Sequence, residues 1–84
     1  MARRQRAPQW IQLKRIHGRT AVLDVGYRHH KFRRYAVQAP PPGSQQGTVF
    51  DKIFALIGIQ NHTATIQIGE DTPFDLTKGV SHVV

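Results

Sequence analysis

Residues 48–58 read TVFDKIFALIG, and this stretch decides the fold class. Its apolar side chains recur at the i, i+3 and i+4 spacing of a core-facing helix stripe, namely Val49, Phe50, Ile53, Phe54 and Ile57. Thr48 with Asp51 three residues later has the form of an N-terminal capping pair, and Gly58 can end a helix in the left-handed conformation. The sequence therefore predicts a short helix over about residues 49–57.

The segments on both sides of this stretch have the composition and alternation of β-strands. Residues 20–25 are rich in β-branched side chains, and the pattern of residues 63–68 alternates apolar with polar. Residues 9–17 fit a strand and a short helix almost equally, and we favour the strand. Further strands are expected over residues 29–38, 72–76 and 80–84. We predict an α+β domain in which a small antiparallel sheet, or a partly open barrel, packs on the one short helix.

The chain length predicts one domain. A chain of 84 residues has room for a single modest core and leaves no room for a deep cleft. Residues 1–8 lack apolar periodicity and carry three arginines, so we expect a flexible basic arm that orders on a partner. Residues 39–47 read APPPGSQQG and are expected to be a Pro-rich connector inside the single small domain at residues 9–84.

The composition excludes some kinds of chemistry and indicates a cellular compartment. The absence of cysteine rules out disulfides, thiol catalysis and Cys-based zinc sites. The longest nearly apolar run, residues 53–59, is too short to cross a bilayer, and the N-terminal residues lack the apolar stretch of a signal peptide. We expect a cytoplasmic protein with no membrane partner, or a nuclear or virion protein if the source has those compartments.

Charge is the strongest functional indication. The chain has 12 Lys and Arg against 5 Asp and Glu, a formal net charge of +7. Ten of these cations lie in residues 1–38, where Asp24 is the only acid, whereas residues 39–84 contain Lys52 and Lys78 against four acids. Eight of the twelve are arginines, whose planar guanidinium can grip phosphate or stack on bases. This asymmetry predicts an oriented face for a polyanion, with nucleic acid as the first expectation.

The residues expected to bind nucleic acid are cations interleaved with aromatic rings. In the strand at residues 29–38 both faces carry Lys or Arg beside an aromatic ring, which suits an exposed sheet face better than a dry core. The expected phosphate contacts are Arg3, Arg4, Arg6, Lys14, Arg15, Arg19, Arg28, Lys31, Arg33 and Arg34, and the expected stacking rings are Trp10, Tyr27, Phe32 and Tyr35. RNA or single strands are mildly preferred over duplex DNA, because the predicted helix has no basic face.

The five histidines do not predict a metal site. His29 and His30 are adjacent, so in a strand their side chains point to opposite faces and cannot easily share an ion. The sequence also lacks a phosphate-binding Gly-rich loop, a Gly-x-Ser-x-Gly elbow and a paired-carboxylate motif. We therefore expect no cofactor and no enzymatic activity.

One local resemblance gives an enzymatic alternative. Residues 47–59, together with residues 26–32, resemble parts of the HicA-type mRNA interferases, which are small basic α+β ribonucleases with a catalytic histidine following a glycine in a sheet. The resemblance covers under a third of the chain. It implies that His29 or His30 is the general base for cleavage at a ribose 2′-OH. The sequence departs from the family where the proline loop replaces a hairpin and a long β segment follows the helix.

A second alternative is a protein partner. A small viral or mobile-element inhibitor could use the basic first half to dock on an acidic or nucleic-acid-binding surface of a host protein. The small size of the chain is also compatible with a homodimer.

Overall fold

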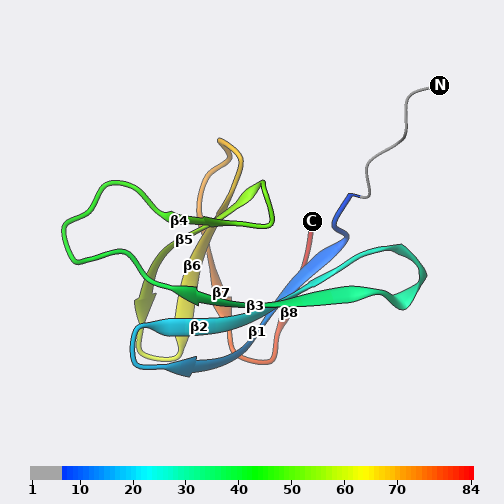
Figure 1. Ribbon diagram of the computed structural model, residues 1–84, viewed down its shortest axis with the longest axis horizontal. Coiled ribbons are helices and arrows are strands. Elements are labelled where there is room, and N and C mark those ends of the chain that lie inside the picture. Colours follow the sequence, from blue (N-terminus) through cyan, green and yellow to red (C-terminus); the bar gives the residue numbers. More distant parts are fainter. Residues whose placement is uncertain (1–6) are drawn as a thin grey trace.

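The computed structural model describes residues 7–84 and shows an all-β domain of two antiparallel sheets (Figure 1). The first sheet has the order β3-β2-β1-β8, with β1 at Trp10–His17, β2 at Thr20–Gly26, β3 at Phe32–Gln38 and β8 at Ser81–Val83. The second has the order β4-β5-β6-β7, with β4 at Thr48–Phe50, β5 at Phe54–Gln60, β6 at Thr63–Ile68 and β7 at Phe74–Thr77. A 3-10 turn, η1, covers Arg28–His30. No helix in residues 7–84 has the length and apolarity to cross a membrane.

The predicted helix is wrong, and with it the α+β fold class. Residues 48–58 form the β4–β5 hairpin, in which Thr48 pairs with Leu56 and Phe50 pairs with Phe54. Gly58, expected to end the helix, instead follows a register shift in β5. The helix implied by the resemblance to the interferases is therefore also replaced by a hairpin.

Long-range contacts explain why the hairpin wins over the helix. The turn between β4 and β5 holds Asp51 and Lys52 at φ angles of 48° and 69°, a left-handed conformation that non-glycine residues rarely adopt. The Asp51 carboxylate accepts hydrogen bonds from the hydroxyls of Tyr27 and Tyr35, which come from the other sheet. These bonds, absent from an isolated peptide, offset the local cost of the turn.

The strand predictions are confirmed except at residues 29–31, because η1 at Arg28–His30 and then Lys31 precede the strand. The segments expected at residues 9–17, 20–25, 29–38 and 63–68 all contain a strand, as do the extended pieces after residues 72 and 80. Residues 39–47 connect β3 to β4 without joining a sheet. The flexible arm was predicted for residues 1–8, and its first six residues lie outside the part of the chain that the structure describes.

The core lies between the two sheets and is built by strand alternation. Most inward residues of β1, β2, β5 and β6 are fully buried, and together with neighbours they form one cluster: Ile11, Leu13, Ala21, Leu23, Val25, Val37, Ala39, Phe50, Phe54, Leu56, Ala64, Ile66 and Leu76. Each large side chain removed from water here contributes about 1.5–3 kcal/mol. At one open side, the rings of Phe74 in β7 and His82 in β8 stack with centroids 3.8 Å apart.

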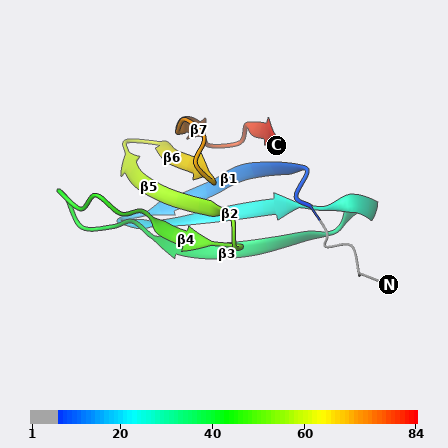
Figure 2. The ribbon, with the colours of Figure 1, turned by 90° about the horizontal axis from the view of Figure 1, so that it is seen from above.

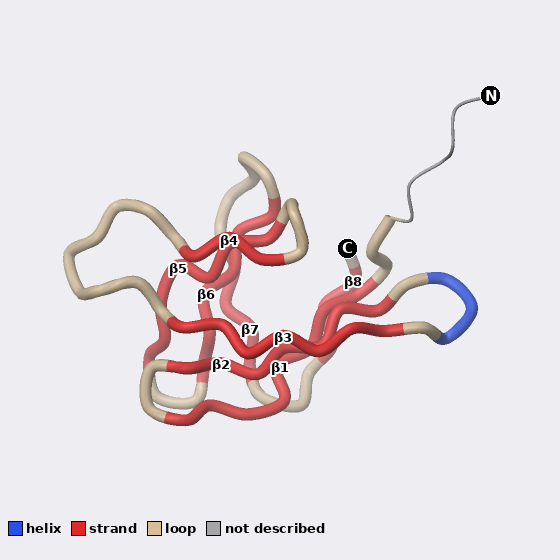
Figure 3. Tube along the Cα trace, in the orientation of Figure 1, coloured by secondary structure: helices blue, strands red, loops and turns tan. Residues whose placement is uncertain are grey.

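The β2–β3 hairpin gives the molecule its length. The principal extents are 44 × 25 × 20 Å, and the hairpin end that carries η1 projects well past the second sheet in both ribbon views (Figures 1 and 2). The η1 turn marks this far end, opposite the proline-rich connector (Figure 3). The outer face of the first sheet is thus longer than the second sheet beneath it.

Candidate nucleic-acid interface

The outer face of the first sheet carries a cross-strand row of apolar side chains at one end. Trp10 of β1 pairs with Val83 of β8 and with Gly26 of β2, and Gly26 in turn pairs with Phe32 of β3. Because alternate residues share a face, this row lies on the side away from the buried Ile11, Val25 and their neighbours. The structure therefore brings Trp10 and Phe32, two of the four rings predicted to stack, onto one solvent-facing row.

Gly26 decides how the tryptophan lies. A Cβ atom at this position would come within 1.9 Å of Trp10 Cε2 and 2.0 Å of Trp10 Nε1, so the indole lies directly across the glycine backbone. Phe32 beside it is 52% exposed and Val83 is 80% exposed. Trp10 is half-buried and held in place by this backbone contact, so its ring loses little freedom when a ligand stacks on it. Sequence reasoning missed Gly26, although a glycine in a strand is often a place where another group approaches closely.

An ion pair between a buried carboxylate and an exposed guanidinium lies in the next row of the same face. Asp24 of β2 is the buried charged residue of the described chain, and it pairs directly with Arg34 of β3. Arg34 Nε lies 2.8 Å from Asp24 Oδ1 and Arg34 Nη2 lies 3.1 Å from Oδ2, a two-point contact. The hydrogen bond to Asp24 raises the pKa of Arg34 further above its usual value. The guanidinium carbon is 5.9 Å from the centre of the Phe32 ring, so the pair also positions a cation beside that ring.

The tip of the β2–β3 hairpin is basic and exposed. Arg28, His29, His30 and Lys31 are all exposed, and the two histidines have φ angles of 65° and 61°. The loop is closed by a hydrogen bond of 2.7 Å from the Tyr27 amide to the Lys31 carbonyl. These cations lie next to the row that contains the Trp10 and Phe32 rings, the ring row, because β2 ends at Gly26 and β3 begins at Phe32.

The two tyrosines among the predicted stacking rings lie elsewhere. Both are half-buried and turn toward the second sheet, where their hydroxyls donate to the Asp51 carboxylate, with 2.8 Å from Tyr35 Oη to Asp51 Oδ1. The Tyr35 ring packs on Phe50 at 5.7 Å between centroids. Burial, and next the hydrogen bond to Asp51, raises the pKa of Tyr27. These side chains tie the two sheets together.

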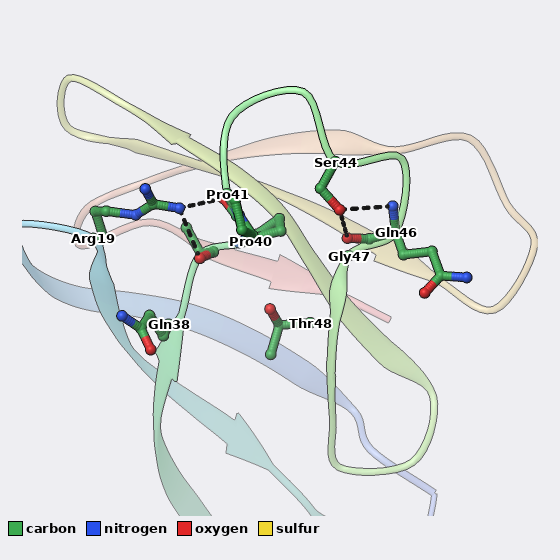
Figure 4. Close-up of a pocket in the computed structure, with 9 residues that line it drawn as sticks. Arg19, Gln38, Pro40, Pro41, Ser44, Gln46, Gly47 and Thr48 are labelled. Carbon is green, nitrogen blue, oxygen red and sulfur yellow. Dashed lines mark hydrogen bonds between the residues drawn. The ribbon is translucent and has the colours of Figure 1, made fainter.

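The remaining predicted cations follow the first sheet away from the rings. Arg33 is exposed on the other face of β3, and Lys14 and Arg15 are exposed where the β1–β2 register shifts. Arg19, in the β1–β2 turn, donates from Nη2 to the carbonyls of Ala39 and Pro40 at 3.2 and 2.5 Å (Figure 4). Arg3, Arg4 and Arg6 lie outside the described residues.

Arg19 holds the proline-rich connector through these two hydrogen bonds, and the pocket beside it contains no other charged side chain. The pocket of Figure 4 lies between these hydrogen bonds of Arg19 and the turn in which Ser44 bonds to the backbone of Gln46. Arg19 is the one ionic group in its lining, which is otherwise made of Gln38, Ala39, Pro40, Pro41, Ser44, Gln46, Gly47 and Thr48.

Most cations of the first sheet are free of internal carboxylates. Within residues 7–84, Arg34 and Asp24 form the one ion pair closer than 4.0 Å. The arginines and lysines of the hairpin tip and of β1 are therefore not neutralised by their own protein. The same range of residues holds no cluster of three or more metal-ligating side chains.

Known proteins offer no guide to this site. No protein-family model, no curated protein and no solved structure matches the chain.

Proposed function

We propose that this protein is a noncatalytic nucleic-acid-binding module that takes a single strand, RNA in first place, across the outer face of the β3-β2-β1-β8 sheet. The observation that carries the proposal is the row in which Trp10 lies across Gly26 beside the exposed Phe32. Trp10 and Phe32 stack on bases, and the cations around them hold the phosphates. The assignment of Tyr27 and Tyr35 to stacking is dropped from the proposal, because their hydroxyls are engaged by Asp51.

The chemistry of the row favours single strands over duplex. Base stacking on aromatic side chains needs splayed bases, and it tolerates any sequence because every base has a π-face. A duplex would hide those faces, and residues 7–84 contain no α-helix that could enter a major groove. The unpaired cations at the hairpin tip, Arg28 and Lys31, supply electrostatic attraction next to the rings.

The direct test uses the one tryptophan of the chain as the reporter. Titration with single-stranded RNA, single-stranded DNA and duplex DNA should quench or shift the fluorescence of Trp10 with the single strands and leave it nearly unchanged with duplex. If about 4–6 phosphates are contacted, log affinity for a single strand should fall with log salt at a slope of roughly −3 to −4. Binding that leaves the Trp10 emission unchanged would remove the ring row from the site.

The salt slope also tests the cations. Replacing Arg28 and Lys31 by alanine should make the slope less steep by about 1–2 units if both contact phosphate. Both are exposed, and neither replacement leaves Asp24 without its partner. Lys52→Ala, in the β4–β5 turn, is the control and should leave the slope unchanged. An unchanged slope after the Arg28 and Lys31 replacements would place the phosphates elsewhere.

The same samples distinguish the alternatives. RNA cleavage that is lost on His29→Ala or His30→Ala, with binding retained, would support a ribonuclease instead. A partner that remains bound after nuclease digestion would support a protein-binding effector. Intact RNA and loss of the bound material on digestion are the results expected for the proposed module.

A further inference from the structure

A basic groove lies away from the ring row, at the other end of β1. It has a volume of about 490 Å³ and is lined by Lys14, Arg15, Ile16, His17, His62 and Lys78. Three of these side chains are permanently cationic, two are imidazoles, and no carboxylate is among the described residues that line it. None of the three cations is within 4.0 Å of a carboxylate in residues 7–84. His17, His62 and Lys78 were not among the binding residues predicted from the sequence.

The backbone builds this groove from three separate segments. The register of β1 against β2 shifts between Leu13 and Arg15, which leaves Lys14 as the extra residue of a bulge. The β5–β6 turn presents His62 after Asn61, which has a φ angle of 57°.

The β7–β8 turn, which carries Lys78, is fixed to the bulge by two hydrogen bonds. The Gly79 amide donates to the Leu13 carbonyl at 2.9 Å, and Gln12 Nε2 donates to the Gly79 carbonyl at 3.0 Å. Lys78 is thus held beside the bulge in the folded chain. A site assembled in this way has already met the entropic cost of gathering its cations.

We propose that this groove is a second anion site that binds a linear chain of phosphate groups without reading bases. Lysine and arginine together supply several donors and positive charge for neighbouring phosphate oxygens, and the groove lacks an exposed aromatic ring on which a base could stack. The assignment does not depend on stacking at Trp10. With a strand rise of about 3.3 Å per residue, Arg15 lies roughly 16 Å along β1 from Trp10, so one nucleic-acid strand can reach both sites.

The test is calorimetric titration with tripolyphosphate. Lys14→Gln combined with Lys78→Gln should weaken binding about tenfold or more, because each lysine loses a charge-assisted hydrogen bond. Lys52→Gln removes one charge from an exposed position outside both the groove and the nucleic-acid site, and it should weaken binding less than about twofold. A loss with Lys52→Gln equal to that of the double variant, or no binding to the parent protein, would overturn the proposal.

One further ligand identifies the source of the phosphates. An abasic oligonucleotide that binds with the same dependence on Lys14 and Lys78 would assign the groove to a nucleic-acid backbone. Binding of tripolyphosphate but not of the abasic strand would support the phosphate site and assign it to a free polyphosphate. Trp10→Ala should leave tripolyphosphate binding unchanged even if it abolishes base stacking, so failure of the ring row and failure of the groove give different results.

Discussion

The two sheets share one architecture and one core, yet their outer surfaces differ in chemistry. Both are four-stranded and antiparallel. Residues 10–38, which form most of the first sheet, contain seven Lys and Arg against Asp24 alone, whereas residues 48–77 contain Lys52 against four acids. The core needs only the inward half of each strand, so the outward half is free to carry function. The difference is that most of the positive charge lies on one sheet, whereas both sheets contribute to the buried core.

The largest expected effect tests whether the sheets are one cooperative unit. Phe54 of the second sheet is fully buried and stacks on Phe50 with centroids 5.5 Å apart. Phe54→Ala should therefore lower the free energy of unfolding by about 3–5 kcal/mol in urea denaturation. Trp10 fluorescence, a probe in the first sheet, should report the same shifted transition. A Trp10 transition that stays in place would show that the first sheet folds without the second.

The next effect separates binding from stability. Trp10→Ala should weaken single-strand binding by about 1–3 kcal/mol, the usual worth of one stacked base. Trp10→Phe should recover part of the affinity because a ring is retained. Val49→Ala replaces a side chain on the second sheet that is 67% exposed, and it should change neither affinity nor stability appreciably. A loss with Val49→Ala equal to that with Trp10→Ala would contradict the assignment of binding to the first sheet.

A smaller effect should follow from cutting the link between the sheets. Asp51→Asn keeps one acceptor oxygen but removes the negative charge of the carboxylate, which accepts hydrogen bonds from the two tyrosine hydroxyls. We expect a loss of about 1–2 kcal/mol in the free energy of unfolding, measured by thermal or urea denaturation. In a Tyr27→Phe, Tyr35→Phe background the same replacement should cost much less. An undiminished cost in that background would show that the tyrosines are not the partners that matter.

The smallest expected effect is a loss of folding stability at alkaline pH. The raised pKa of Tyr27 in the folded state means that folding favours its neutral form, so this stabilisation is complete below the unfolded value of 10.0 and decreases as pH rises above it. Tyr27 should therefore ionise at a higher pH than a free tyrosine in an absorbance titration near 295 nm. Asp51→Asn should bring that ionisation to lower pH. Ionisation of Tyr27 at the pH usual for a free tyrosine would contradict the burial and bonding of Tyr27.

Most strands could be predicted because their alternation is local. The mistaken helix at residues 49–57 shows where local patterns stop being sufficient. Phe50, Phe54 and Ile57 have the spacing of a helix face, but Phe54 and Leu56 also have the alternation of a strand. The many β-branched residues of this segment favour the strand. The deciding turn holds Asp51 and Lys52 in left-handed conformations without a glycine or asparagine to announce it. Its stabilising partners lie 16 and 24 residues away.

The candidate site was predictable in part for the same reason. The cation-rich half of the chain and the alternation of Phe32 and Arg34 are visible in the sequence. The position of Trp10 over Gly26 depends on the register between β1 and β2. The contact of Tyr35 with Asp51 depends on which face of β3 packs against the second sheet. The basic groove combines three segments far apart in the chain, so no local pattern indicates it.

The pairing of β1 with β8 has a kinetic consequence. Trp10 is matched with Val83, so the first sheet gains its fourth strand only after the chain has closed a loop of nearly its whole length. Such non-local pairing belongs to domains that refold in milliseconds to seconds, a range that stopped-flow emission can follow. Until β8 arrives, the beginning of β1 is an open edge able to pair with another molecule. Refolding yield should accordingly fall with protein concentration, and a chain shortened before residue 81 should aggregate more readily than the intact one.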